Sequence, residues 1–107
     1  MYLVRDIMYC KPGKVRKLVD TFHAMNDLSV KVGMPPMRIM TDFCAERYWT
    51  LVSEMEVENL AEYETLVAGQ PANATAEDAK KFEEIMKDYH DLVDYGKREI
   101  YKLERKK

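Results

Sequence analysis

The sequence predicts an α+β fold of the order β-α-β-β-α-β, the ferredoxin-like plan of a four-stranded antiparallel sheet with helices on one face. Three observations predict it. A segment rich in β-forming residues, 2–10, passes through a short break into an amphipathic helix. Two further strand-like segments then form a hairpin, and a helical stretch in two pieces leads to a last strand. The 107 residues are expected to form one domain, 1–107, around a single core.

The first strand and the first helix carry the clearest local signals. Val, Ile and Tyr recur over residues 2–10, and Lys-Pro-Gly at 11–13 stops the strand. A helix is predicted from about Lys14 to Val32, because apolar residues recur there every three or four positions and so share one face. Gly33 ends it, since glycine readily takes the left-handed conformation after a helix. The apolar stripe consists of Val15, Leu18, Val19, Phe22, Met25 and Leu28 or Ser29.

A hairpin follows the helix. Strands are predicted over Met37–Cys44 and Arg47–Val57, with Ala45-Glu46 or a slightly longer turn between them. Successive residues of a strand point to opposite faces. One face of the second strand would carry Trp49, Leu51, Ser53, Met55 and Val57, and the other, wetter face would carry Tyr48, Thr50, Val52, Glu54 and Glu56.

The next helical piece is short. Asn59, with Glu62 three residues later, matches the capping box that begins many helices. A helix is predicted over Leu60–Ala68, where Gly69 can end it. Residues 70–74 then form a polar connector.

A second capping pattern opens the longer helical piece. Thr75 and Asp78 predict a helix start, and the apolar spacing continues to about Tyr95. Gly96 is its expected terminator. The last strand is predicted over Lys97–Glu104.

Composition excludes several classes of protein. Hydrophobic residues make up 47% and charged residues 34%, which is typical of a folded globular chain. No apolar run is long enough to span a membrane, and charge stands where a signal peptide needs its apolar stretch, so a cytoplasmic location is expected. The net charge is −2, and residues 53–94 are strongly acidic, so nucleic acid is not an expected partner.

Neither cysteine nor histidine predicts a metal site. Cys10 and Cys44 lie in different predicted strands without ligand spacing, and buried reduced thiols are expected. His23 and His90 lie at the edges of their helical stripes, where a boundary histidine is the simpler interpretation. The two histidines are isolated from each other in the chain, so no metal is expected.

A sheet with helices on one face leaves its other face open. In the first strand that face carries either Leu3, Ile7 and Tyr9 or Val4, Met8 and Cys10, and the sequence leaves open which set it is. Both sets are largely apolar. Because a contiguous apolar patch usually marks an interface, we expect a second copy of the same sheet to cover it through a two-fold axis.

At this point the chain resembles the dimeric α/β-barrel superfamily, in which two ferredoxin-like subunits pack sheet to sheet. Two stretches look most like the NIPSNAP branch, with the antibiotic-biosynthesis and haem-degrading monooxygenases as more distant relatives. They are Lys-Pro-Gly-Lys at 11–14 and the pattern W-x-L-V-x-E-x-E at 49–56, which leads into L-A-E-Y-E at 60–64. The element order extends the resemblance over nearly the whole chain.

The resemblance implies a fold more than a reaction, because members of the superfamily range from oxygenases to isomerases. Haem-degrading relatives typically use an Asn from the first strand, a Trp and a helix His. Trp49 and His90 have the right residue types, but the first strand contains no Asn. We therefore expect no cofactor, with haem as the alternative.

Charged residues inside apolar strands are the best pointers to a site, since a buried charge is costly unless it is paired. Arg5, Asp6, Arg38, Asp42 and Glu54 are of this kind. One interpretation is that Arg5 or Arg38 pairs with Glu54 or Asp42 across strands to fix their register. The other is that these groups line a cavity that orients a small polar ligand.

Tyr9, Tyr48, Trp49 and Tyr101 could form an aromatic pocket, although aromatic residues in strands more often simply fill a core. The leading hypothesis is a small homodimer that binds a small, partly apolar molecule in its barrel, with no assigned reaction. The alternatives are a cofactor-independent or haem-linked monooxygenase or an isomerase, and a structural module. The expected ligand-lining residues are Arg5, Tyr9, Arg38, Asp42, Tyr48, Glu54 and His90.

Overall fold

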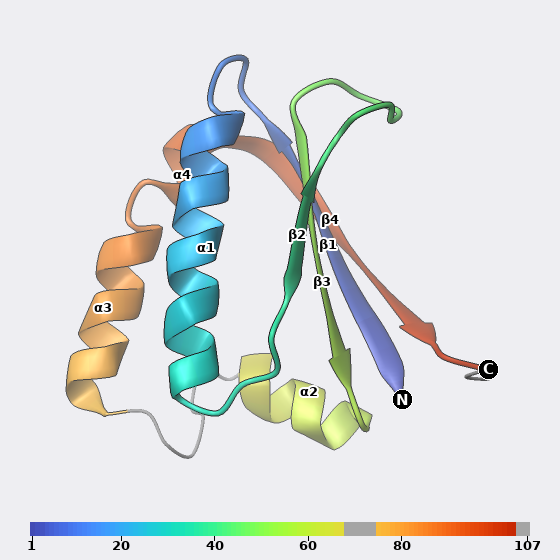
Figure 1. The fold of residues 1–107 in the computed structure, drawn as a ribbon, viewed down its shortest axis with the longest axis vertical. Helices are drawn as coiled ribbons and strands as arrows, with labels where there is room; N and C mark the ends of the chain where they lie inside the picture. Colours follow the sequence, from blue (N-terminus) through green and yellow to red (C-terminus); the bar gives the residue numbers. More distant parts are fainter. Residues whose placement is uncertain (68–74, 105–107) are drawn as a thin grey trace.

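The computed structural model describes residues 1–67 and 75–104, and it has the predicted order of strands and helices (Figure 1). The second helical stretch is divided, as predicted, and a further single-turn helix precedes the last strand. The elements are β1 (Tyr2–Cys10), α1 (Val15–Lys31), β2 (Arg38–Thr41), β3 (Thr50–Val57), α2 (Leu60–Val67), α3 (Ala76–Met86), α4 (Tyr89–Leu92) and β4 (Val93–Lys102).

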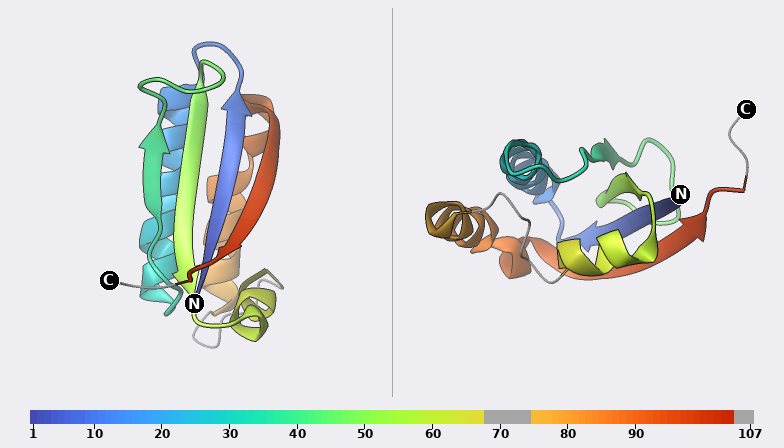
Figure 2. Two further views of the ribbon diagram at one scale, coloured as in Figure 1. Left: turned by 90° about the vertical axis from the view of Figure 1, so that its right-hand side faces the viewer. Right: turned by 90° about the horizontal axis from the view of Figure 1, so that it is seen from below.

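The four strands form one antiparallel sheet in the order β2-β3-β1-β4. Helices α1 and α3 lie on one side of it, and no described helix covers the other side (Figures 1 and 2). This is the predicted ferredoxin-like plan. We call the uncovered side the open face.

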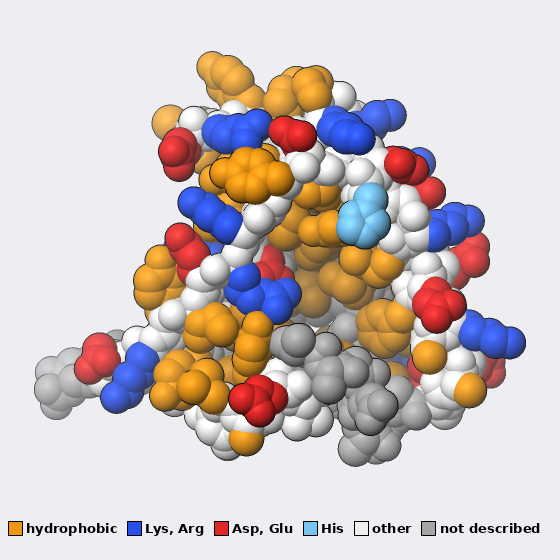
Figure 3. All heavy atoms as spheres, turned by 180° about the vertical axis from the view of Figure 1, so that it is seen from behind, with side chains coloured by type: hydrophobic (Ala, Val, Ile, Leu, Met, Phe, Trp, Pro, Cys, Tyr) orange, Lys and Arg blue, Asp and Glu red, His pale blue; other side chains and the backbone are white. Residues whose placement is uncertain are grey.

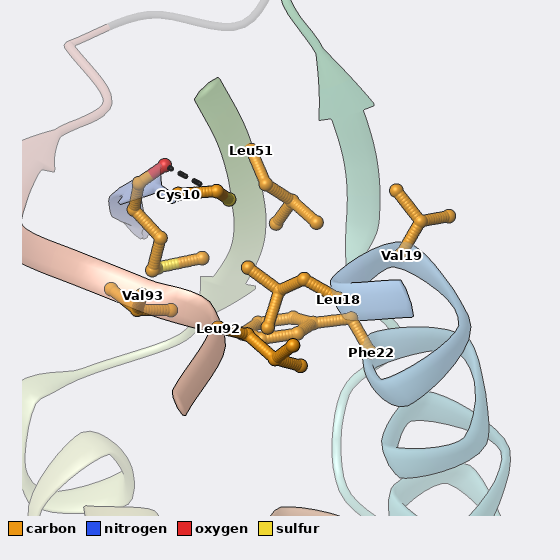
Figure 4. Packing of buried hydrophobic residues seen from close by; sticks show 8 residues of the cluster. Cys10, Leu18, Val19, Phe22, Leu51, Leu92 and Val93 are labelled. Carbon is orange, nitrogen blue, oxygen red and sulfur yellow. Dashed lines mark hydrogen bonds between the residues drawn. The ribbon is translucent and has the colours of Figure 1, made fainter. Parts of the chain in front are cut away.

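Alternation along β1 decides which residues reach the core. Met8 and Cys10 point toward the helices and are buried, whereas Leu3, Arg5 and Ile7 point to the open face. Side chains from β1, β3, α1 and the junction of α4 with β4 meet on the helix side (Figure 4). The buried cluster consists of Met8, Cys10, Leu18, Val19, Phe22, Leu51, Leu92 and Val93.

Helix α1 matches its prediction closely. It is one residue shorter at each end than predicted, and Leu18, Val19 and Phe22 of its stripe are buried against the sheet. Gly13 before it and Gly33 after it both have positive φ, 79° and 87°, a conformation that favours glycine at the two turns. The breaks that the sequence predicts at these two glycines therefore correspond to backbone turns.

The predicted hairpin strands are too long. β2 ends at Thr41 and β3 begins at Thr50, so residues 42–49 form a loop where Ala45-Glu46 or a slightly longer turn was expected. The Asp42 backbone N–H donates to the Thr50 carbonyl (3.1 Å), and the Asp42 carboxylate accepts from the Thr50 backbone N–H (2.9 Å). This side-chain bond replaces the next rung of the ladder, and Trp49 has a left-handed φ of 62° that a strand does not allow.

The predicted helix to Tyr95 is also wrong. α3 ends at Met86, α4 is one turn, and Val93 is already extended and pairs with Cys10. Gly96 therefore does not terminate a helix but lies in β4 opposite Met8. A Cβ on Gly96 would lie 3.1 Å from the Ile7 carbonyl oxygen, so the strands meet closely there.

Both predicted capping patterns occur. The Thr75 hydroxyl accepts from the Asp78 N–H, and the Asp78 carboxylate accepts from the Thr75 N–H, both at 3.1 Å. At α2 the Asn59 side chain accepts from the Glu62 N–H (2.8 Å), while the Glu62 carboxylate accepts one residue earlier than predicted, from the Glu58 N–H. The predicted stop at Gly69 and the connector 70–74 lie outside the described residues.

Leu18 offers a test of the core. Leu18→Ala is expected to lower the free energy of unfolding by about 2–5 kcal/mol, because Leu18 is fully buried in the cluster and its removal leaves a cavity. Urea denaturation followed by circular dichroism measures the loss. Val30→Ala, at a half-exposed position of the same helix, should change stability by less than about 0.5 kcal/mol. Equal effects of the two substitutions would contradict this packing.

Candidate functional site on the open sheet face

The open face can be defined by strand register, because residues directly opposite each other in neighbouring strands point to the same side. Arg5 lies opposite Glu54 on β3 and Glu99 on β4, and Arg38 on β2 also lies opposite Glu54. The remaining members follow by alternation. They are Leu3, Ile7 and Tyr9 on β1, Met40 on β2, Thr50, Val52 and Glu56 on β3, and Tyr95, Lys97 and Tyr101 on β4.

A cluster of three charged residues lies within this face. The Arg5 Nε donates to Glu54 Oε2 at 2.6 Å, and the Arg38 Nη2 donates to Glu54 Oε1. The side chain of Glu54 is 8% exposed, against 34% for Arg5 and 70% for Arg38. The Arg5 guanidinium also lies over the Tyr101 ring, 5.3 Å from its centroid. One nearly buried carboxylate thus joins three strands through two arginines.

The arginines determine the charge state of Glu54. Burial alone would raise the pKa of this carboxyl, but the hydrogen bonds and positive charges of Arg38 and Arg5 outweigh burial and lower it. The hydrogen bond to Glu54 likewise raises the pKa of Arg5. All three groups are therefore charged at neutral pH, and the cluster carries a net charge of +1.

A hollow of about 270 Å³ lies beside the cluster at the start of β2. Its lining combines the charged residues Arg38, Glu54 and Glu56 with Pro35 and Pro36. Apolar side chains of β1 and β3 continue the face beyond the cluster, among them Ile7 and Val52. The site therefore offers a fixed polar group next to apolar surface, the combination typical of small-molecule pockets.

A second group of side chains covers Tyr9 at the other end of the open face. The Tyr9 and Tyr95 rings are 5.0 Å apart, and the Arg47 guanidinium lies over them at 4.5 and 5.6 Å. Asp94 lies 3.7 Å from Arg47. Tyr9 is buried as a result, and the loop 42–49 is held to the sheet through Arg47.

The predicted ligand-lining residues thus fall into separate places. Arg5, Arg38 and Glu54 meet in the cluster, and Tyr9 shares their face at its opposite end. The other three lie elsewhere. Asp42 and Tyr48 belong to the loop 42–49, and His90 lies on α4 with its ring against Tyr89.

The four aromatic residues proposed as one pocket are not brought together. Tyr9 packs with Tyr95, and Tyr101 lies under Arg5. Tyr48 and Trp49 lie in the loop, with Tyr48 85% exposed. The loop is longer than expected, and it holds Tyr48 and Trp49 before β3 begins.

Sequence reasoning missed Arg98, which partners Asp6 on the helix side of the sheet. Arg98 donates through Nε and Nη2 to the two Asp6 oxygens at 2.5 and 3.0 Å, and through Nη1 to the Tyr63 hydroxyl at 2.8 Å. The hydrogen bond to Asp6 is the main reason why the pKa of Arg98 is raised, and the bond to Tyr63 adds to the effect. Figure 3 shows hydrophobic side chains gathered in a hollow on the side of the molecule where β4 lies.

The two thiols differ. Cys10 is buried, and burial raises the pKa of its thiol. Cys44 is exposed, contrary to the prediction, because β2 ends before it and it lies in the loop 42–49.

Two further searches of the described residues, 1–67 and 75–104, gave negative findings. No three side chains of His, Cys, Asp or Glu in this part of the chain come together as metal ligands would. No described helix combines the length and the apolar character needed to cross a membrane.

Comparison with known proteins gave structural neighbours alone. No family model matches the sequence, and no curated protein is similar to it. An uncharacterized NIPSNAP domain protein from Burkholderia xenovorans has a TM-score of 0.75 at 8% identity, over 96% of this chain and 94% of its own. A NIPSNAP family protein with unknown function from Agrobacterium tumefaciens has a TM-score of 0.75 at 11% identity, over 96% of this chain and 87% of its own.

A solved antibiotic biosynthesis monooxygenase is also similar, with a TM-score of 0.67 at 11% identity, over 96% of this chain and 98% of its own. Coverage of nearly the whole chain in each case confirms the predicted likeness to these proteins at the level of the fold. At such identities the likeness concerns the fold alone, since one scaffold supports unrelated functions.

Glu54 can be tested through the pH dependence of stability. Its lowered pKa means that the unfolded chain binds this proton more readily, so its stabilisation is complete above the ordinary pKa of a glutamate and is lost as pH falls through the lower folded value. Glu54→Gln should therefore lower the free energy of unfolding by about 1–3 kcal/mol at neutral pH, and by less at about pH 3.

Urea denaturation of both proteins at the two pH values measures this difference. Glu83→Gln, which removes an exposed carboxylate of α3, is the matched control and should have little effect at either pH. A deficit in Glu54→Gln that stays constant down to about pH 3 would show that charge at Glu54 does not stabilise the fold.

Proposed function

We propose that this protein forms a homodimer through its open face and binds a small, partly apolar molecule in the barrel that the two sheets enclose. The observation that carries the proposal is the cluster of Arg5, Arg38 and Glu54, a fixed set of charges within an otherwise largely apolar sheet face.

The apolar area of the open face supports self-association. Met40 on β2 and Tyr95 and Tyr101 on β4 are exposed large hydrophobic residues at the two edge strands of this face. Leu3, Ile7 and Val52 lie between them and are partly buried. A contiguous surface of this kind usually marks an interface, and a two-fold axis lets one surface meet its own copy.

The arginines support a ligand with a hydrogen-bond acceptor. A guanidinium has five N–H donors, and the bond from Arg38 to Glu54 uses one of them. If a second sheet removes water from this face, the remaining donors need new acceptors. A small molecule with an apolar body and a carboxylate, carbonyl or similar group would supply them beside the 270 Å³ hollow.

A monooxygenase acting in the same barrel is the second candidate. One solved antibiotic biosynthesis monooxygenase shares the fold, and the half-exposed Tyr95 ring, which packs at a tilt against Tyr9, could position a flat substrate at the far end of the open face. The two candidates differ in one measurable respect. A monooxygenase consumes dioxygen when its substrate is added, whereas a binding protein does not.

The dimer is tested by light scattering at micromolar concentration, where the protein is expected to have twice the mass of one chain. Ile7→Arg should give a monomer, because Ile7 lies at the middle of the open face and a charge there would be buried without a partner. Val30→Arg on α1 is the control and should remain dimeric. A monomeric wild-type protein would refute this assembly.

Ligand binding is tested with anilinonaphthalene sulfonate, a fluorescent probe with an apolar body and one acidic group. Its fluorescence should rise saturably with the wild-type protein, and Arg38→Gln should weaken its binding about tenfold, the effect of one lost charge-assisted hydrogen bond. Arg16→Gln, an exposed position on α1, should bind the probe like the wild type. Equal binding by all three proteins would remove Arg38 from the site.

A further inference from the structure

A second hollow lies beside the loop 42–49, away from the cluster of Arg5, Arg38 and Glu54. Its volume is about 380 Å³, within the range of small-molecule pockets. Thr41 is on the helix side of β2, because it lies opposite the core residue Leu51, and Val15 begins α1. The hollow thus opens between the loop and the start of α1. Its lining residues are Val15, Thr41, Asp42, Tyr48 and Trp49.

The wall formed by the loop is held in place at both ends. Asp42 and Thr50 close the neck of the loop with the two bonds described above. The Cys10 backbone N–H donates to the Trp49 carbonyl (2.8 Å), and the Thr50 hydroxyl donates to the Arg47 carbonyl (2.8 Å). These bonds keep Trp49 at its left-handed φ of 62°, a conformation that costs free energy in a bulky residue. A ligand would meet a preorganised wall.

The hollow has a negative character. Asp42 is the single charged residue among those that line it, and its Oδ2 takes no part in the bond to Thr50. The cation of the loop, Arg47, is held over Tyr9 and Tyr95 on the open face instead. The carboxylate therefore keeps its charge available to the hollow.

Two aromatic rings stand beside this carboxylate. Tyr48 is 85% exposed and Trp49 is 44% exposed, so neither ring is buried in the core. The faces of aromatic rings attract cations, and tryptophan does so most strongly. A carboxylate, a tyrosine and a tryptophan around one apolar hollow match an organic cation in both charge and surface.

We propose that the hollow between the loop 42–49 and α1 binds an organic ammonium compound, with the cationic nitrogen against Asp42 and the Tyr48 and Trp49 rings and the apolar part against Val15. The site is separate from the open face. It requires neither a dimer nor the cluster of Arg5, Arg38 and Glu54.

Trp49 is the single tryptophan of the chain, so its fluorescence reports directly on this site. Titration with benzyltrimethylammonium is expected to change the emission saturably. Benzyl alcohol and phenylacetate, which present a similar ring without charge or with negative charge, should bind at least about fivefold more weakly. The Ile7→Arg protein should respond to the cation like the wild type, even if the proposed dimer or the ligand of the open face does not exist.

Substitutions within the loop complete the test. Asp42→Asn keeps the Oδ1 acceptor for the Thr50 N–H and removes the charge, and should weaken binding about fivefold to tenfold. Glu46→Gln makes the same charge change in the same loop outside the hollow and should have little effect. Tyr48→Leu, at a position exposed enough to leave the fold intact, should weaken binding about threefold.

Three results would each overturn the proposal. These are no saturable response to benzyltrimethylammonium, equal affinity for phenylacetate, and unchanged binding in both Asp42→Asn and Tyr48→Leu. If Asp42→Asn did not fold, Tyr48→Leu and the charge series of probes would still decide the matter.

Discussion

The pairing of β1 with both β3 and β4 is the constraint on which the rest of the molecule depends. This strand has a partner along both edges, and its alternate residues serve opposite purposes. Met8 and Cys10 fill the core, while Arg5 and Ile7 belong to the open face. A slip of one residue would exchange the two sets, placing a guanidinium in the core and apolar side chains on the other side. The register of β1 therefore determines both the core and the candidate site.

Two adjacent residues secure this register from opposite faces. Arg5 binds Glu54 of β3 on the open face, and Asp6 binds Arg98 of β4 on the helix side. Both partners lie directly opposite their residues in the ladder, so a shifted pairing would separate both pairs at once. Arg98 extends the second pair to the Tyr63 hydroxyl and so ties α2 to the sheet. Ion pairs of this kind add modest stability but select strongly among registers.

Features governed by near neighbours could be predicted from the sequence, and those governed by distant contacts could not. The stripe of α1 and the cap at Thr75 depend on residues within one or two helical turns, and both were predicted. The start of β4 depends on Val93 pairing with Cys10, which overrides a helical pattern that continues to Tyr95. In the same way, one interpretation of the sequence paired Arg5 or Arg38 with Glu54 or Asp42, but both arginines share Glu54 because β2, β3 and β1 are neighbours. Arg47 was missed because Tyr9 and Tyr95 meet only in the folded sheet.

The chemistry of the open face favours a ligand over a purely structural role. A dimer interface that served assembly alone would gain more from apolar residues at these three positions, since replacing a buried ion pair by well-packed hydrophobic side chains is often neutral or stabilising. Arg5, Glu54 and Arg38 instead place three charges in this face, one of them on the Arg38 side chain, which is still 70% exposed. Enclosing that charge between two sheets is costly unless an acceptor comes with it. A small molecule that brings an acceptor offsets this cost. The register of β1 against β3 does not explain the second arginine, because the pair of Arg5 with Glu54 is enough to set it.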